Sequence, residues 1–344
     1  MQIEKKVLAQ LEKCYAVAPL TYHGESCFLV AAEKHERCLL FSAQGALLDT
    51  VWHGPGGVMT MEHVPDTDGA FLATHEFYSP NDSQNAKIVL AYPTQHGWQI
   101  KTLANLPFVH RFTIVSTNHG RYVVAATLKS AHAFKDDWTC PGRIWAAPLP
   151  DNDVLLRDAP PLQFTAIQSG LFKNHGFFKY QEGTDTHLLF GAQNGVFHVT
   201  PPASAQDAWA VECILDKPTS DMALIDLDGD GERELVTYSP FHGEALTIYK
   251  KDSTGYTAVY THAEPLAFLH AICAGTLQNK AVMVLGHRAG ARNLCLLQYQ
   301  NGYTLTVIDS DIGPANAMLL HANGNEAIVC ANRETDEIAL YQVL

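Results

Sequence analysis

The chain has 344 residues, of which 47% are hydrophobic and 17% charged, so it can bury a large core and does not belong to the disordered class. Its formal net charge is -13 and no segment concentrates Lys and Arg, which argues against nucleic acid as a partner. No uncharged apolar run reaches the roughly 18 residues that cross a membrane, and residues 1–13 contain no apolar leader segment, so we expect a cytoplasmic protein that binds no membrane.

Short apolar or alternating runs recur along the whole chain and are bounded by Gly, Pro, Asn and Asp. This pattern predicts β-strands, and no long segment has the 3.6-residue period of a helix. The clearest predicted strands, in chain order, are 27–33, 38–43, 46–52, 86–93, 121–128, 142–149, 187–193, 195–201, 234–240, 245–250, 281–287, 293–299, 304–310, 327–333 and 338–343. The chain is therefore predicted to be all-β.

The predicted strands group in fours with a repeat of about 45 to 55 residues, which is the period of a four-stranded propeller blade. In one domain spanning 1–344, the predicted blades are 14–54, 55–107, 108–168, 169–217, 218–266, 267–312 and 313–344. The last blade has only three strands, whereas residues 3–13 offer a spare strand. Pairing the two ends would cover two exposed sheet edges. We therefore predict a seven-bladed β-propeller whose ring is closed by an N-terminal strand that completes the last blade.

One acidic motif lies between two strands of the fifth predicted blade. Asp226, Asp228, Asp230 and Glu234 occur with glycines between them, a spacing that lets alternate carboxylates converge on a hard cation such as Ca²⁺. The motif resembles the DxDGDGxxEL loop of FG-GAP or VCBS-type propeller repeats, which often holds calcium. We expect these four residues to form a structural calcium site.

Polar residues recur at two positions of the predicted blades. With strands named a to d, the d-to-a and b-to-c connections lie on one face of a propeller, which we call the top. The starts of the strands named a carry His110, Arg111, Asn174, His175, Asp221, His270 and Asn316. At the ends of b strands occur Glu33, Lys34, His35, His75, Glu76, Lys129, Gln193, Asn194, His242, His287, Arg288, Asn332, Arg333 and Glu334. We expect these groups to surround the top opening of the central channel.

The chemistry of this ring suggests a site. Imidazoles can hold a transition metal such as Zn²⁺ or Mn²⁺, with His110, His175 and His270 as candidate ligands, and they can also act as general acids and bases. The predicted catalytic residues are His110, His175, His270 and His287. The predicted substrate-binding residues are Arg111, Lys129, Arg288, Arg333, His75 and His242. The fixed positive charge of the three arginines and Lys129 favours an anionic or polyhydroxylated ligand.

Several of these segments resemble the propeller part of aldos-2-ulose dehydratase and related bacterial VCBS-repeat proteins. They are 109–112, 136–138, 141–142, 174–176, 270–275, 286–288 and 332–334. The resemblance implies a metal-containing propeller that removes water from a keto-sugar after abstracting a carbon-bound proton. The cupin-like portion found beside that propeller in the fungal enzyme is missing from this chain.

Three functions follow as hypotheses. The first is a carbon-oxygen lyase, a dehydratase or β-eliminase, that acts on a small sugar, keto-sugar or sugar acid, with a top-face histidine taking the proton. The second is a propeller that binds a ligand or a protein without chemistry, since one fold hosts many functions. The third is a glycoside hydrolase, which requires two carboxylates across a cleft. Its candidate carboxylates are Glu33, Glu76, Asp221 and Glu334.

Overall fold

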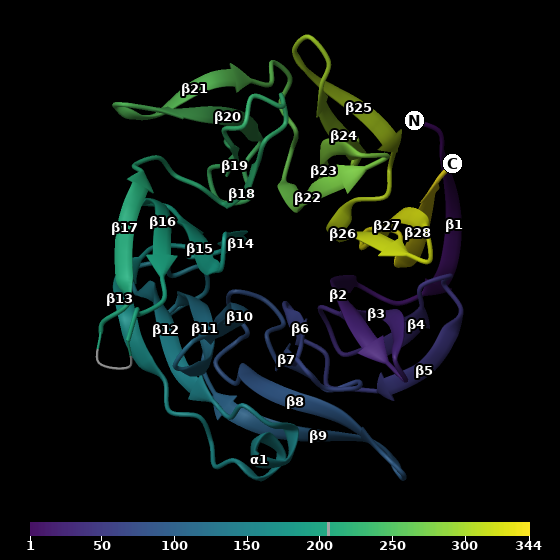
Figure 1. Cartoon of the computed structure of the whole chain (residues 1–344), viewed down its shortest axis with the longest axis vertical. Coiled ribbons are helices and arrows are strands. Elements are labelled where there is room, and N and C mark those ends of the chain that lie inside the picture. The colour runs from purple at the N-terminus through teal and green to yellow at the C-terminus, as the bar shows by residue number, and fades with distance from the viewer. Residues whose placement is uncertain (205–206) are drawn as a thin grey trace.

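The computed structural model describes residues 1–204 and 207–344. They form seven antiparallel sheets of four strands each, arranged radially around one axis (Figure 1). The first sheet contains β2 (Cys14–Tyr22), β3 (Glu25–Ala32), β4 (Cys38–Ser42) and β5 (Leu47–Trp52). The second contains β6 (Met61–His63), β7 (Phe71–His75), β8 (Lys87–Thr94) and β9 (Gly97–Asn105). The third contains β10 (Val109–Thr117), β11 (Gly120–Lys129), β12 (Pro141–Leu149) and β13 (Thr165–Leu171).

The fourth sheet contains β14 (Gly176–Glu182), β15 (Asp185–Ala192), β16 (Gly195–Thr200) and β17 (Ala210–Leu215). The fifth contains β18 (Asp221–Ile225), β19 (Glu234–Ser239), β20 (Ala245–Asp252) and β21 (Gly255–Thr261). The sixth contains β22 (Leu269–Leu277), β23 (Lys280–His287), β24 (Leu294–Tyr299) and β25 (Tyr303–Asp309). The seventh contains β26 (Pro314–Ala322), β27 (Asn325–Asn332), β28 (Glu337–Val343) and β1 (Ile3–Gln10). The first strand of each group lies nearest the axis (Figure 1).

The N-terminal strand closes the ring, as the sequence predicts. β1 pairs antiparallel with β28, from Ile3 opposite Val343 to Gln10 opposite Glu337. Lys5 reinforces this closure, because its ammonium lies 3.0 Å from the Glu337 carboxylate and 2.9 Å from that of Asp309 in the neighbouring blade. The predicted seven-bladed propeller and its mode of closure are therefore confirmed.

Burial along the strands follows their place in the blade. Middle strands such as β3 and β27 are buried over six consecutive residues, since both faces of the sheet pack on neighbouring blades. The outer strand β5 is exposed over its first three residues. The core therefore lies between the blades, which leaves the inner strands free to line the channel.

Three connections between inner and second strands are two-residue hairpins in which both residues have positive φ. They are His23–Gly24, Gln278–Asn279 and Asn323–Gly324. The fifth blade has the acidic loop 226–233 in this place, on the bottom face opposite the d-to-a connections.

The third blade has two further features, a longer last strand than the sequence predicts and a short helix. β13 ends at Leu171, past the expected blade end at 168, because Leu171 pairs with Gly142. The connection before it contains α1 (Asp153–Asp158), whose N-cap residue Asn152 accepts a hydrogen bond from the Leu155 amide. Among the residues that the structure describes, no helix is long and apolar enough to span a membrane.

Candidate functional site

Four of the inner strands begin with the same corner. A residue with positive φ precedes the strand, the next residue pairs with the second strand, and the following residue is bulged out of the ladder. The positive-φ residues are Lys13, Phe108, Phe268 and Gly313, at 50°, 64°, 62° and 54°, and the bulged residues are Tyr15, His110, His270 and Ala315. Bulges redirect side chains near functional sites. This repeated corner brings Tyr15, His110 and His270 together at the top end of the channel.

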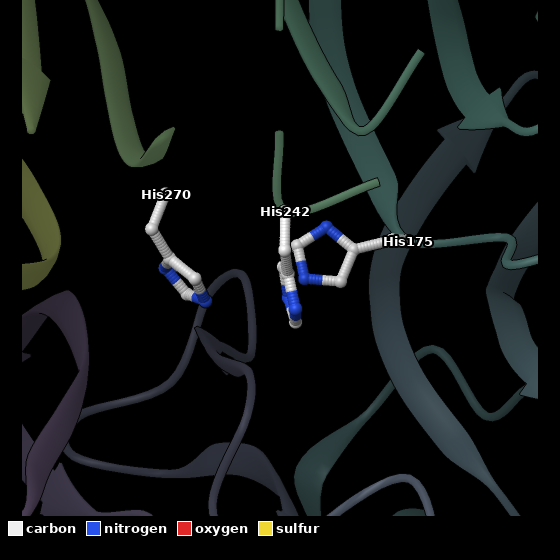
Figure 2. A group of neighbouring side chains, drawn as sticks. All are labelled: His175, His242 and His270. Atoms are coloured by element: carbon white, nitrogen blue, oxygen red, sulfur yellow. The ribbon is translucent and has the colours of Figure 1, made fainter. Parts of the chain in front are cut away.

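Three histidines from different blades form a cluster that we call the histidine trio: His175, His242 and His270. One ring nitrogen of each lies within 4.8 Å of the others, and Figure 2 shows the rings turned toward one another. His175 directly precedes β14, His270 lies in β22, and His242 lies in the β19–β20 loop with φ of 51°. Positive φ in a non-glycine residue is a strained conformation that gathers at functional sites.

Backbone carbonyls orient two of the three rings. His175 Nδ1 donates to the Ser220 carbonyl at 3.0 Å, and His270 Nδ1 donates to the Ala315 carbonyl at 2.6 Å. Because each Nδ1 carries the proton, each Nε2 carries a lone pair instead of a hydrogen. The Tyr15 hydroxyl donates to His270 Nε2 at 3.1 Å, whereas the Nε2 atoms of His175 and His242 are buried without a hydrogen-bond partner.

The three histidines of the trio are neutral near pH 7. Burial lowers the pKa of His175 and His270 well below the usual value, and the neighbouring His242 and Arg288 lower both further. Burial lowers the pKa of His242 to about 3. Neutral imidazoles with inward lone pairs can bind a transition metal or accept a proton.

The structure brings the predicted histidines together only in part. His110 lies beside the trio, with its ring centroid 4.5 Å from that of His175, and burial lowers its pKa well below the usual value. Its Nδ1 is buried without a partner, but the group whose ligand atoms converge contains His242 instead of His110. His242, which the sequence suggested as a substrate-binding residue, is therefore better placed as a metal ligand than His110.

His287 and His75 are not members of the trio. His287 Nδ1 donates to the Ala289 carbonyl at 2.9 Å, and its Nε2 accepts from the Asn293 amide at 3.2 Å. Both ring nitrogens of His287 therefore stabilise its own loop, which leaves neither for the catalytic role expected of it. His75 packs edge-on against Trp52 with ring centroids 4.6 Å apart, and burial lowers its pKa to about 4.

Two of the predicted substrate-binding arginines are held by carboxylates. Arg288 donates twice to Glu334, at 3.1 and 2.9 Å, and Arg333 donates to Glu334 at 2.7 Å and to Glu33. This network joins blades six, seven and one across the top face. It also engages Glu33 and Glu334, two of the four candidate carboxylates of the hydrolase hypothesis.

Lys129 is likewise committed to structure. It is 1% exposed and donates to the Asp137 carbonyl at 3.1 Å, with its ammonium 4.7 Å from the centroid of the Trp138 ring. It thus anchors the long loop 130–140 between β11 and β12. Trp138 in turn contacts Phe241, whose ring lies 5.3 Å from that of His175, so this loop covers the trio from the top.

Arg111 is the one predicted cation that faces the channel interior. It lines a cavity of about 240 Å³ together with residues of all seven blades. Its guanidinium donates to the Met59 carbonyl at 3.2 Å and lies 3.5 Å from the Asp221 carboxylate. Burial raises the pKa of Asp221 to about 6, although Arg111 and two backbone amides act in the opposite direction.

The acidic loop holds a lysine among its carboxylates. Lys250 Nζ on β20 lies 2.6 Å from Asp228 and 3.2 Å from Glu234, and it also contacts Asp230. Hydrogen bonds to these carboxylates, that of Asp228 first, raise the pKa of Lys250. Asp226 instead accepts from the amides of Gly229 and Gly231. A calcium ion bound by Asp226, Asp228 and Glu234 would have to compete with this ammonium.

Tyr15 is the residue that sequence reasoning overlooked. It is 2% exposed, and burial raises its pKa to about 12. Its position in the sequence could have identified it, because Tyr15 occupies the same place in the first blade as His110 and His270 in the third and sixth blades.

Comparisons with known proteins show the fold alone. No protein-family model matches the sequence, and no curated protein matches it. A solved structure of virginiamycin B lyase from Staphylococcus aureus is similar, with 15% identity, a TM-score of 0.62, and 100% of this chain and 99% of that chain covered. Sqt1 from Saccharomyces cerevisiae is also similar, with 11% identity, a TM-score of 0.53, and 100% and 87% covered.

Proposed function

We propose that this protein is a carbon-oxygen lyase that acts on a small sugar, keto-sugar or sugar acid, with a divalent transition metal bound by His175, His242 and His270. One observation carries the proposal: three neutral imidazoles from separate blades converge within 4.8 Å, and two of their Nε2 atoms are buried without a partner. An unpaired buried acceptor is destabilising by about 1 to 3 kcal/mol. A metal ion would satisfy these nitrogens together.

The donor set favours zinc among the metals considered. Carbonyls of Ser220 and Ala315 orient two of the rings through Nδ1, as outer-shell acceptors do in metal centres. Three imidazoles without a carboxylate suit Zn²⁺, whereas Mn²⁺ prefers oxygen ligands. When bound, the metal would supply a Lewis acid that polarises a substrate carbonyl or carboxylate oxygen.

His110 is the proposed proton acceptor. Its Nδ1 has no partner and its ring is neutral, so it can take the proton α to a carbonyl or carboxylate. The electron pair of that C–H bond forms the new double bond as the C–O bond on the next carbon breaks. The proton held at His110 then passes to the departing oxygen, which leaves as water or an alcohol.

Two similarities to known proteins support a lyase. A solved propeller similar to this chain is named as a lyase, virginiamycin B lyase. Sequence segments of this chain also resemble the propeller part of aldos-2-ulose dehydratase, which implies a metal-containing propeller that removes water from a keto-sugar. The hydrolase hypothesis is weakened, because Glu76 pairs with Lys87 at 2.6 Å and Glu33 and Glu334 pair with arginines. A cytoplasmic location belongs to the proposal.

Elemental analysis of the purified protein tests the metal, and a screen of hydroxy acids and keto-sugars tests the reaction through the ultraviolet absorbance of the unsaturated product. We expect about one zinc per chain, lost in His175→Ala and His242→Ala and retained in His321→Ala, whose side chain is 46% exposed. His110→Ala should keep the metal and lose turnover.

The rival functions give different results. A bound metal with no turnover in any substrate class would favour a ligand-binding propeller. Wild-type protein that takes up no transition metal under any loading condition would overturn the proposed centre.

A further inference from the structure

The cavity beneath the histidine trio is a separate feature of the channel. Its lining includes Ala16, Arg111 and Asn316, which directly follow Tyr15, His110 and Ala315 on their strands. Because Tyr15 contacts His270 and His110 contacts His175, the histidine trio lies directly above the cavity. At about 240 Å³ the cavity has room for about eight waters of roughly 30 Å³ each, which is below the roughly 300 Å³ at which drug-sized pockets begin.

The far end of the cavity reaches solvent. Along β14, Gly176 is buried whereas Lys179, which lines the cavity, has 34% of its side chain exposed. The Lys179 ammonium is neutralised there, because it lies 2.6 Å from Glu62 and also donates to the Ile114 carbonyl at 3.3 Å. Glu62 accepts two further hydrogen bonds, from Thr113 and from the Ile114 amide. This pair leaves little unsatisfied charge at the solvent end.

Arg111 has donors to spare at the inner end. A guanidinium has five N–H donors. In the part of the chain that the structure describes, Arg111 makes one hydrogen bond, to the Met59 carbonyl, and one longer contact of 3.5 Å to Asp221. Its side chain is only 12% exposed, so solvent does not replace the missing acceptors well.

Asp221 pairs with Arg111 only at a long distance. Its Oδ1 already accepts from the amides of Phe177 and Met222, and the 3.5 Å separation of its Oδ2 is longer than a normal hydrogen bond. Arg111 therefore keeps N–H donors without a close acceptor at the inner end of the cavity.

The geometry points to a carboxylate-binding subsite: Arg111 binds the carboxylate of a small hydroxy acid in this cavity and directs the rest of the molecule toward the trio. A guanidinium binds a carboxylate through two parallel hydrogen bonds, which gives orientation as well as affinity. A three- or four-carbon hydroxy acid matches the cavity volume. The claim that this hydroxy acid is the substrate rests on the proposed function. The claim that the cavity binds it does not.

Calorimetric titration of metal-free protein with D-glycerate tests the subsite, and glycerol is the matched ligand without a carboxylate. We expect wild type to bind glycerate and not glycerol. Arg111→Gln should weaken glycerate binding about 10- to 100-fold, the range for losing hydrogen bonds to a charged group. Arg111→Lys keeps the charge without the planar fork and should fall between the two.

Two further variants test whether binding depends on Arg111 itself or on the charge of the cavity in general. Lys179→Gln should change glycerate affinity much less than Arg111→Gln, because its ammonium is already paired. Asp221→Asn should tighten binding several-fold, because it removes the competing carboxylate, and it keeps the test decisive if Arg111→Gln fails to fold. Equal affinity in wild type and the Arg111 variants, or no tightening in Asp221→Asn, would overturn the inference. Glycerate binding without any metal binding would uphold the subsite and refute the proposed lyase.

Discussion

Replacing the buried Asp221 by Asn should change how the stability of the propeller depends on pH. Burial raises the pKa of this carboxyl from 3.8 to about 6 in the folded protein. A raised folded-state pKa contributes stability that is fully present below the unfolded pKa and is lost as pH rises through 6. A shift of about two pKa units corresponds to about 3 kcal/mol. Because Asn cannot ionise, the stability of Asp221→Asn does not fall in this way as the pH rises.

The measurable quantity is the free energy of unfolding of wild type minus that of Asp221→Asn. Between about pH 4 and about pH 8 this difference should fall by about 2 to 3 kcal/mol, since part of the effect lies below pH 4. With an unfolding entropy of about 2.1 cal/mol/K per residue, the same change corresponds to about 3 to 4 °C in the relative melting temperature of a 344-residue chain. Contributions of the buried histidines cancel, because both proteins contain them.

Denaturant unfolding followed by Trp fluorescence at several pH values gives this difference, with melting temperatures as a second measure. Thr237→Val is the matched control, because Thr237 is buried on the adjacent strand and cannot titrate, so its destabilisation should not vary with pH. A difference between wild type and Asp221→Asn that stays flat across the range would show that burial does not govern this carboxyl.

Three other outcomes follow from the contacts described above. Lys250→Gln should lower the melting temperature, and added Ca²⁺ should then stabilise the variant more than wild type; an equal calcium response would refute the competition between lysine and calcium. Deletion of residues 1–10 should expose the edge of β28 and cause self-association visible by light scattering, whereas a monomeric and equally stable product would contradict the closure argument. Lys129→Met should make loop 130–140 sensitive to limited proteolysis, and unchanged cleavage would show that the Asp137 contact does not anchor it.

The architecture was accessible from sequence because it depends on local signals. Strand runs separated by turn residues repeat at blade length, and both chain ends supply the parts of one incomplete blade. The positions of His175 and His270 at the starts of inner strands follow from the same strand order. Sequence periodicity reports which residues neighbour one another along a strand and which face of the sheet they share.

The membership of the site depended on distances between blades. That His242 and not His110 joins His175 and His270 depends on a loop residue with positive φ, and the place of Tyr15 depends on a bulge. The partners of Arg288, Arg333 and Lys250 come from other blades or other strands. The sequence by itself determined the strands, the seven blades and the face on which polar residues gather, since these follow from local period and chain order. Tertiary structure decided which side chains meet and which are neutralised, because that depends on the twist and packing of sheets far apart in the chain.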